Sequence, residues 1–358
     1  MVALVLLSRG QAAGTGARVE RVENCGLLFT DNRAGVNGTD AGYSIPMGGR
    51  TLWLFGDVFL QDPVATTKPF AGSLSNCGLL AAAGHGPDPL LRYNFLTDPA
   101  TGLARQLIPR LPGEDEKVRL WPFGGWYSRA ERKVYLYYGR VRVTGGGPLD
   151  FRPDGMGLAV ADARQPEKLT FTRLKNVDGS LIWWPASRAV FGSAVMEREG
   201  WLYVFGYRNR GGRNVATLAR VRSDRVADSS AYAYWRGDGW SRDMALVADV
   251  EGLSDFPTEL SVSYNAYLGG FLAVHSVNLG EKARLSVAKE PWGPYRQIGE
   301  IDTRHQPFAK AFCYAGKEHP ELAEENGRIV YVTWVDSSRY WLHLLRITLG
   351  KEGGNARK

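Results

Sequence analysis

Short apolar stretches separated by Gly-rich or polar turns recur along the whole chain, and this pattern predicts β-strands rather than helices. The clearest case is a hairpin over residues 40–57, whose two strands flank the dipeptide Gly48-Gly49. Two consecutive glycines accept the positive φ angles of a tight hairpin turn. Helical periodicity is weak, and the best helix candidates are the short segments 102–108 and 321–325.

This hairpin is predicted to carry two carboxylates at its open end. With a two-residue turn at Gly48-Gly49, Asp40 directly faces Asp57. Facing residues share one side of the sheet, with Cβ atoms about 4.5–5.5 Å apart. Like charges at that separation repel unless one group holds a proton or a ligand or cation pairs with them. A bulge at Gly42 would shift the register by one residue and break this pairing.

The hairpin layout repeats about five times, each time followed by further short strands. The first strands of these units begin near residues 40, 120, 191, 259 and 319. Self-similar four-stranded antiparallel units are typical of propeller blades. The last unit has three obvious strands, and residues 18–28 would supply its fourth and close the ring. We therefore predict an all-β fold, a five-bladed β-propeller with four-stranded antiparallel blades; a two-sheet sandwich is the alternative.

The chain reads as one domain with short flanking segments. We predict a single propeller over residues 17–348, a leader or residual signal segment over 1–16 and a disordered tail over 349–358. The leader resembles the end of a secretory signal without its basic region, so we expect a secreted or periplasmic protein, with a disordered leader as the alternative. No apolar run approaches the ~20 residues of a membrane helix. We expect no membrane span and a monomer.

Charge and composition narrow the range of partners. Lys and Arg number 44 against 37 Asp and Glu, which leaves a net charge of +7. A basic surface attracts polyanions, but the basic residues are scattered, and the nearest cluster, at 208–213, is explained as well by a solvated loop. No nucleic-acid motif is present, so we expect no nucleic acid partner. A basic interaction scaffold is a third and weaker reading.

Cysteine and cofactor motifs are sparse. The three cysteines, Cys25, Cys77 and Cys313, form no CxxC pair, and whether Cys25 and Cys77 are bridged is left open. Motifs for zinc proteases, nucleotide phosphates and serine hydrolases are missing from the sequence. We predict no metal site and no cofactor, and we leave open whether an ion sits at the centre of the ring.

Three acids are the main catalytic candidates. In a propeller the innermost strands surround the central channel, so their starts place Asp40 and Glu259 at one mouth of that channel. The second strand of the first hairpin ends at the same mouth and brings Asp57 there. Glycoside hydrolysis needs two carboxyl groups, one as acid and one as base or nucleophile. We predict Asp40 as base or nucleophile, Glu259 as acid and Asp57 as a group that tunes Asp40 or binds hydroxyls. The alternatives are a turn-capping Asp40 and an Asp57 that accepts loop N–H groups.

Further residues at this mouth are candidates for sugar contacts. His275, opposite Glu259, is expected to modulate its pKa, and His319 and Glu321 are expected to alternate along one strand. Tryptophans suit stacking on sugar rings, although packing between blades is the commoner role. The predicted substrate-binding set is Trp121, Arg140, Arg208, His275, His319, Glu321 and Trp334.

Several of these segments resemble the signature of a bacterial propeller family described as a domain of unknown function. The segments are Gly38-Thr39-Asp40, 52–57, Ser75-Asn76, Tyr234-Trp235 with Trp240, 259–264 and 319–322. The resemblance covers about residues 20–348, and some members are endo-D-arabinanases that cut the arabinan of mycobacterial arabinogalactan and lipoarabinomannan. The segment 288–295 is similar to a strand connection in five-bladed arabinanases, xylosidases and fructosidases. In those enzymes an inner-strand Asp of blade one and a Glu of a later blade catalyse.

The resemblance implies a glycoside hydrolase that cuts a furanoside polysaccharide. Its expected activity is that of an endo-D-arabinanase, and its expected partner is the arabinan of cell-wall glycans. Analogy at the level of the fold does not establish function. A non-catalytic carbohydrate-binding propeller is therefore the alternative, and it predicts binding without release of new reducing ends.

Overall fold

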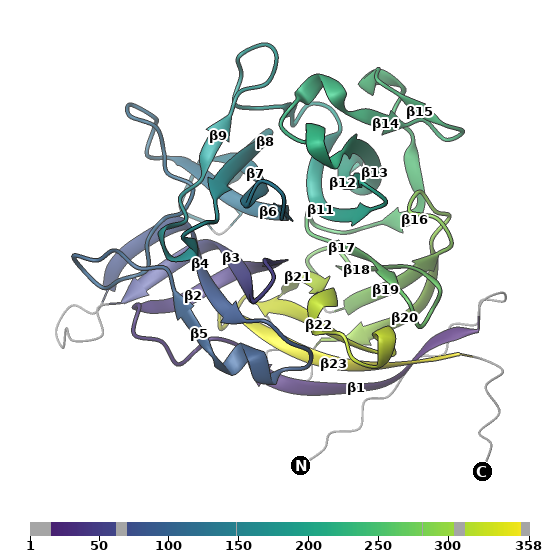
Figure 1. Cartoon of the computed structure of the whole chain (residues 1–358), viewed down its shortest axis with the longest axis horizontal. Helices are drawn as coiled ribbons and strands as arrows, with labels where there is room; N and C mark the ends of the chain where they lie inside the picture. Colours follow the sequence, from purple (N-terminus) through teal and green to yellow (C-terminus); the bar gives the residue numbers. More distant parts are fainter. Residues whose placement is uncertain (1–15, 62–69, 148, 281, 304–311, 352–358) are drawn as a thin grey trace.

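The computed structural model describes residues 16–61, 70–147, 149–280, 282–303 and 312–351 of the 358-residue chain. These residues form five antiparallel sheets arranged in a ring (Figure 1). The first strand of each sheet contacts the first strand of the next one around the ring, so β2, β6, β11, β17 and β21 surround a common axis. The predicted five-bladed β-propeller is confirmed.

Blades one to four are each built in chain order from the inner strand outward. Blade one contains β2 (Val36–Pro46), β3 (Arg50–Gln61), β4 (Phe70–Ala82) and β5 (Tyr93–Phe95). Blade two contains β6 (Val118–Ser128), β7 (Lys133–Val143), β8 (Phe151–Asp162), β9 (Thr172–Leu174) and β10 (Trp184–Pro185). Blade three contains β11 (Val190–Arg198), β12 (Trp201–Arg210), β13 (Arg213–Arg222), β14 (Ala233–Trp235), β15 (Trp240–Ser241) and β16 (Asp249–Ser254). Blade four contains β17 (Ser261–Asn265), β18 (Gly270–Ser276), β19 (Lys282–Ala288) and β20 (Arg296–Asp302).

Blade five joins the two ends of the propeller. It contains β21 (Cys313–Glu318), β22 (Ile329–Asp336), β23 (Trp341–Lys351) and β1 (Ala17–Leu27). The antiparallel pairing of β1 with β23 confirms the predicted closing strand and covers an edge that would otherwise be open. Because β23 continues to Lys351, the propeller extends past the predicted limit at 348, and 349–351 are not part of a tail. The rest of the expected leader and tail, 1–15 and 352–358, lies outside the described residues.

Helical structure in the described residues is limited to short 3-10 turns. They are η1 (Asp88–Leu91), η2 (Pro166–Lys168), η3 (Ser223–Arg225), η4 (Ser229–Ala231), η5 (Met244–Leu246), η6 (Pro320–Leu322) and η7 (Glu325–Gly327). The helix expected at 102–108 is wrong, because this segment is irregular and Ala104 forms a single bridge with Thr97. The candidate at 321–325 is not one helix either: it overlaps the end of η6 and the start of η7, and Ala323 and Glu324 between them are not helical. Within the described ranges no helix has the length and apolar character needed to span a bilayer.

The register of the first hairpin differs from the prediction by one residue. The turn falls at Gly48-Gly49 as expected, but Asp40 pairs with Gly56 and not with Asp57. The cause is a bulge at Gly42, which adopts a φ of +73° and shifts the ladder between Ala41 and Tyr43. The two carboxylates are therefore diagonal neighbours on adjacent strands.

Apolar side chains between neighbouring blades hold the ring together. Ile45 and Leu54 of blade one join Leu120 and Leu136 of blade two in one buried cluster, and similar clusters fill the other interfaces. Because close-packed sheets resist displacement, the inner strands form a rigid frame for the groups at their ends. The cysteines Cys25, Cys77 and Cys313 are all free thiols.

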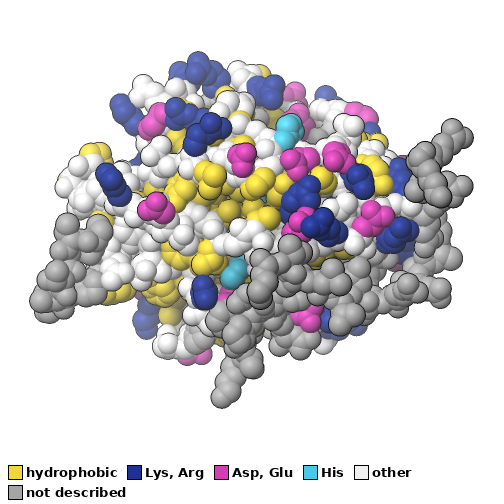
Figure 2. All heavy atoms as spheres, turned by 90° about the horizontal axis from the view of Figure 1, so that it is seen from below, with side chains coloured by type: hydrophobic (Ala, Val, Ile, Leu, Met, Phe, Trp, Pro, Cys, Tyr) yellow, Lys and Arg dark blue, Asp and Glu magenta, His cyan; other side chains and the backbone are white. Residues whose placement is uncertain are grey.

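Positively and negatively charged side chains are intermixed on the surface. On the face seen in Figure 2, Lys and Arg side chains lie interspersed with Asp and Glu rather than in one continuous field. Mixed charge of this kind gives a weak long-range attraction for polyanions. The basic-scaffold reading gains no support on this face.

Candidate active site

Asp40 occupies the inner strand of blade one, with its carboxyl held by two tyrosines of blade five. The hydroxyls of Tyr314 and Tyr340 donate to Asp40 Oδ2 at 2.8 and 3.0 Å. Burial raises the pKa of Asp40 well above its usual range, and the negative charges of Asp57 and Glu259 raise it further against the opposing tyrosine hydrogen bonds. Asp40 is therefore favoured in its protonated form.

Asp57 lies on β3 directly after Gly56, the residue that pairs with Asp40 across the hairpin. A Cβ atom on Gly56 would come within 2.8 Å of Asp40 Oδ1, so glycine leaves the room for this carboxyl. Asp57 itself adopts a φ of 27°, an unusual value for a residue with a side chain. Burial raises its pKa to about 6, while the Trp121 indole and Arg119 guanidinium act in the opposite direction. Arg119 Nε lies 3.8 Å from Asp57 Oδ1.

Glu259 enters the same electrostatic group from blade four. It precedes β17 and is half-buried, and the hydroxyl of Thr258 donates to its Oε2 at 2.9 Å. Its charge raises the pKa values of Asp40, Tyr43 and Lys317. The charges of two sequence-predicted acids, Asp57 and Glu259, thus both act on the third, Asp40, and the three carboxyls form one cluster around it. We call this cluster, with Tyr314 and Tyr340, the channel mouth.

Lys317 is a member of this neighbourhood that the sequence analysis missed. Its ammonium is buried, and it donates hydrogen bonds to the carbonyl oxygens of Ala41 and Ala315. Burial lowers its pKa to about 8, although the nearby carboxyls Glu259 and Asp40 favour the charged form. The Tyr43 ring lies 4.7 Å from its Nζ.

Blade five begins earlier than the sequence predicted, and this moves two predicted site residues. Its inner strand is β21, so His319 and Glu321 follow the strand instead of alternating along it, and the prediction of a shared strand is wrong. Tyr314 takes the place at the mouth that was expected for His319. The apolar run 312–316 was the available signal, but the polar residues 317–319 that follow it obscured the strand.

His319 and Glu321 lie toward the hairpin-turn side of the ring. His319 Nδ1 is 2.7 Å from Ser44 Oγ, and its Nε2 is 2.7 Å from Thr333 Oγ1. Burial holds the pKa of His319 well below its usual range, so the ring is neutral. Burial also raises the pKa of Glu321. Because Ser44 lies four residues beyond Asp40 in β2, on the side of the Gly48-Gly49 turn, this pair is separate from the channel mouth.

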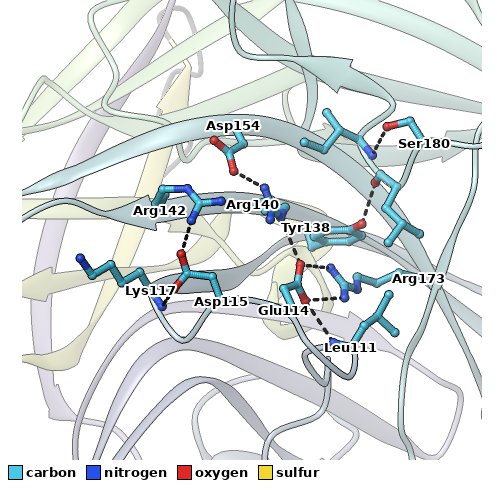
Figure 3. A network of polar contacts seen from close by, with 12 residues as sticks. Leu111, Glu114, Asp115, Lys117, Tyr138, Arg140, Arg142, Asp154, Arg173 and Ser180 are labelled. Carbon is cyan, nitrogen blue, oxygen red and sulfur yellow. Dashed lines mark hydrogen bonds and ion pairs between the residues drawn. The ribbon is translucent and has the colours of Figure 1, made fainter.

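Arg140 is held by an ion-pair network in blade two (Figure 3). Its Nε lies 3.2 Å from Glu114 Oε1, and its Nη1 pairs with Asp154. Arg173 donates two further hydrogen bonds to Glu114, at 2.6 and 3.0 Å. Burial alone would raise the pKa of Glu114, but the bonds from Arg173 and Arg140 hold it at about 2. Arg140 is therefore held by this network and is not placed as a substrate contact.

Three further residues that were predicted to contact substrate are engaged in ion pairs or in packing. Arg208 is paired with Asp249, and its Nη1 donates to the carbonyl of Val247 at 2.9 Å. His275 is fully buried, with a pKa that burial lowers to about 4, and Trp334 is buried against a parallel His343 ring 4.2 Å away. These three side chains are placed for packing or pairing.

Trp121 is the member of the predicted substrate set that lies at the channel mouth. It is partly exposed, and its indole acts on the Asp57 carboxyl. Its ring packs edge-on against Phe151 at 4.8 Å. The indole is thus partly accessible beside the acids. Among the described residues, no group of three or more His, Cys, Asp or Glu is arranged to hold a metal ion.

Comparisons with known proteins agree on the architecture. The model of a family described as "Domain of unknown function (DUF4185)" matches residues 28–346. A candidate hydrolase from Bacteroides ovatus ATCC 8483 superposes with a TM-score of 0.61 at 16% identity, covering 88% of this chain and 87% of its own. A xylan β-1,4-xylosidase from Bacillus halodurans C-125 superposes with a TM-score of 0.51 at 12% identity, covering 91% of this chain and 54% of its own. Identities this low show a shared fold. A search of curated protein sequences finds no significant match.

Proposed function

The chain belongs to the DUF4185 family, and on that premise we propose that it is a glycoside hydrolase that cuts a furanoside polysaccharide. The observation that carries the proposal is the carboxyl cluster at the channel mouth, where Asp40 is buried beside Asp57 with tyrosine hydroxyls as its hydrogen-bond donors. Two carboxyl groups with different proton affinities are the minimum requirement for acid–base cleavage of a glycosidic bond.

The surroundings of the two aspartates suggest how the roles divide. Asp57 faces Arg119 and Trp121, which favour its ionised form, so with a pKa of about 6 it is largely ionised at neutral pH. Asp40 faces two other carboxyls, which favour its protonated form. We assign Asp40 as the group that protonates the leaving oxygen and Asp57 as the nucleophile.

In this mechanism the proton of Asp40 moves to the glycosidic oxygen as the bond to the anomeric carbon breaks. Asp57 forms a covalent bond to that carbon, and the leaving chain departs with its new hydroxyl. Asp40, now ionised, takes a proton from water, which attacks the anomeric carbon and releases Asp57. The tyrosine hydroxyls of Tyr314 and Tyr340 stabilise Asp40 while it is ionised.

The sequence analysis predicts the reverse role for Asp40, as base or nucleophile with Glu259 as the acid, and that assignment stays a prediction. A carboxyl on the adjacent strand suits a short separation and retention of configuration, whereas a carboxyl across the channel leaves room for a water and suits inversion. Proton NMR of the first anomer released from a glycan therefore distinguishes Asp57 from Glu259 as the partner of Asp40.

The proposed substrate is D-arabinan of the mycobacterial type, cut in endo fashion. The support is the sequence resemblance of 38–40, 52–57 and 259–264 to a propeller family that includes some endo-D-arabinanases, together with the partly exposed Trp121 beside the acids. Trp rings stack on sugars through their apolar faces.

The test is incubation of the protein with mycobacterial arabinogalactan, plant L-arabinan, xylan and levan, followed by measurement of new reducing ends and of oligosaccharide length. The proposal expects short oligosaccharides from arabinogalactan. Binding to a glycan without any release would support the carbohydrate-binding alternative. Release from xylan or levan alone would retain the hydrolase and overturn the choice of arabinan.

A further inference from the structure

Two backbone bulges with left-handed residues meet at the inner side of the channel mouth. Ala41 in β2 has a φ of 60°, and Ala315 in β21 has a φ of 56°. An alanine in this region is strained because its Cβ approaches the backbone, so each conformation needs support from its surroundings. Both residues lie at register shifts, one between Ala41 and Tyr43 and the other between Tyr314 and Lys317.

The carbonyl oxygens of these two strained residues accept hydrogen bonds from the same ammonium group. Lys317 Nζ donates to the oxygen of Ala41 and, at 2.7 Å, to the oxygen of Ala315. Ala41 directly follows Asp40, and Ala315 directly follows Tyr314. The Lys317 ammonium thus links the backbone next to Asp40 with the backbone next to Tyr314, whose hydroxyl donates to the Asp40 carboxyl.

The position of Lys317 in the interior makes this arrangement dependent on the acids of the mouth. Its side chain is buried, and besides the two carbonyl oxygens its ammonium contacts the Tyr43 ring, whose centroid lies 4.7 Å from Nζ. The charged groups that act on it are Glu259 of blade four and Asp40 of blade one. The neighbouring His319 is kept neutral by burial, with a smaller contribution from the Lys317 charge. A buried ammonium is tolerated when it is hydrogen-bonded and paired with opposite charge.

We propose that Lys317 is a positioning residue that clamps the two bulges and thereby fixes the Asp40 carboxyl against the Tyr314 hydroxyl. Its positive charge also limits how strongly Asp40 holds its proton. The catalytic consequence rests on the proposed function, whereas the clamp itself is a property of the fold.

The experiment compares Lys317→Met, which keeps the packing volume but removes the charge and the donors, with Lys317→Arg, which keeps both. Lys282→Met is the matched control, because Lys282 forms an ion pair with Glu300 on blade four, at 3.1 Å. The titration of Asp40 is followed by carboxyl ¹³C NMR, with Asp40→Asn identifying the signal. The kcat and KM on arabinogalactan are measured in parallel.

In Lys317→Met the apparent pKa of Asp40 is expected to rise by about one unit, a tenfold change in proton affinity. The kcat is expected to fall about 100-fold with KM changed less than about threefold, because the reacting groups are misplaced while the sugar contacts remain. Lys317→Arg is expected to restore the titration to within about half a unit. Lys282→Met is expected to match the wild type in both readouts.

An unchanged Asp40 titration in folded Lys317→Met would overturn the clamp, whatever the activity. A changed titration with unchanged kcat would overturn the catalytic consequence. If the wild type releases no oligosaccharide from any glycan, the proposed function fails, and the NMR titration alone decides the clamp. If Lys317→Met does not fold, Lys317→Gln, which loses the charge but keeps a donor for one carbonyl, is put to the same titration.

Discussion

Glu114, in the loop that leads into blade two, and Asp40, in blade one, are both acids with little access to solvent, but their neighbours differ in kind. Glu114 is surrounded by the guanidinium groups of Arg173 and Arg140, and its pKa is held at about 2 (Figure 3). Asp40 has tyrosine hydroxyls as donors and the carboxyl of Asp57 as its charged neighbour, and its pKa is raised. Burial acts on both groups in the same direction, so the partners decide the protonation state.

This difference in neighbours distinguishes the Glu114 network, which is structural, from the channel mouth, which is a candidate catalytic site. Paired charges in blade two satisfy each other and leave no proton to move at neutral pH. The channel mouth keeps one acid protonated beside one that ionises near pH 6. Such unfavourable proximity persists where the surrounding frame enforces it, and it is characteristic of functional sites.

The largest expected effect comes from the second carboxyl of the mouth. Asp57→Asn is expected to lower kcat about 10³-fold, because the nucleophile is lost while the fold is kept. Asp115→Asn, which removes an exposed partner of Arg142 in blade two, serves as the control with kcat unchanged. The measurement is the initial rate of reducing-end release. A small effect of Asp57→Asn together with a large effect of Glu259→Gln would transfer the role to Glu259.

Breaking the blade-two network should affect stability instead of chemistry. Glu114→Gln leaves Arg173 and Arg140 without their anion, and we expect a loss of about 3 kcal/mol in unfolding free energy at pH 7. Because the folded pKa of Glu114 lies below its unfolded value, its stabilisation is present above the unfolded pKa and disappears as the pH falls toward 2. The loss on substitution should therefore shrink in acid.

Urea unfolding of Glu114→Gln at pH 7 and pH 3 measures this loss. Glu325→Gln, at an exposed ion pair with Arg328, is the control and should cost less than about 1 kcal/mol. A cost for Glu114→Gln that is equal at both pH values would contradict the proposed electrostatics of blade two.

These two regions also differ in how far the sequence predicted them. The hairpin turn at Gly48-Gly49 and the closing strand β1 were predicted because each depends on a local pattern. The pairing of Asp40 was missed by one residue because a bulge depends on tertiary packing. Arg140 was assigned to substrate because its partner Glu114 comes from a separate loop, and ion pairs between distant segments leave no periodic signal.

Blade five shows a further reason why part of the structure could not be predicted from the sequence. Its inner strand buries two charged residues, Lys317 and Glu318, so the apolar pattern by which strands are recognised is interrupted. The partners that make these polar residues tolerable belong to other blades, such as Ser263, whose hydroxyl donates to Glu318 at 2.7 Å. The three candidate acids of the mouth were identifiable in the sequence because each flanks an apolar run, those of the first hairpin for Asp40 and Asp57 and the one beginning at Leu260 for Glu259.

Removing one tyrosine donor should have an intermediate effect. Tyr340→Phe deletes one of the two hydroxyls that favour ionised Asp40, so the pKa of Asp40 should rise by about one unit. If Asp40 is the acid, kcat/KM falls with rising pH through its pKa, and the basic limb of the profile moves to higher pH. If Asp40 is the base, the acidic limb moves instead. Tyr264→Phe, on the hairpin-turn side of blade four, should shift neither limb.

The smallest effect is a gain in stability at the mouth. Because the folded pKa of Asp57 is raised, the folded state loses stability as the pH rises from the unfolded pKa to about 6. Asp57→Asn removes this penalty, and with a one-third exposed side chain we expect a gain of about 1 kcal/mol at pH 8 and almost none at pH 4. Denaturant unfolding at both pH values provides the comparison. A destabilised Asp57→Asn at pH 8 would mean that the carboxylate is satisfied by its neighbours, as Glu114 is.

The account depends most on Asp40, and the most direct measurement is the rate at which folded wild type and Asp40→Asn release reducing ends from mycobacterial arabinogalactan at pH 7. Binding of the same glycan to both proteins is measured by calorimetry, and their thermal unfolding confirms that both are folded. We predict release by the wild type, a rate at least about 10³-fold lower for Asp40→Asn and similar binding by both. Equal rates for the two proteins would contradict the assignment of the channel mouth as the catalytic centre.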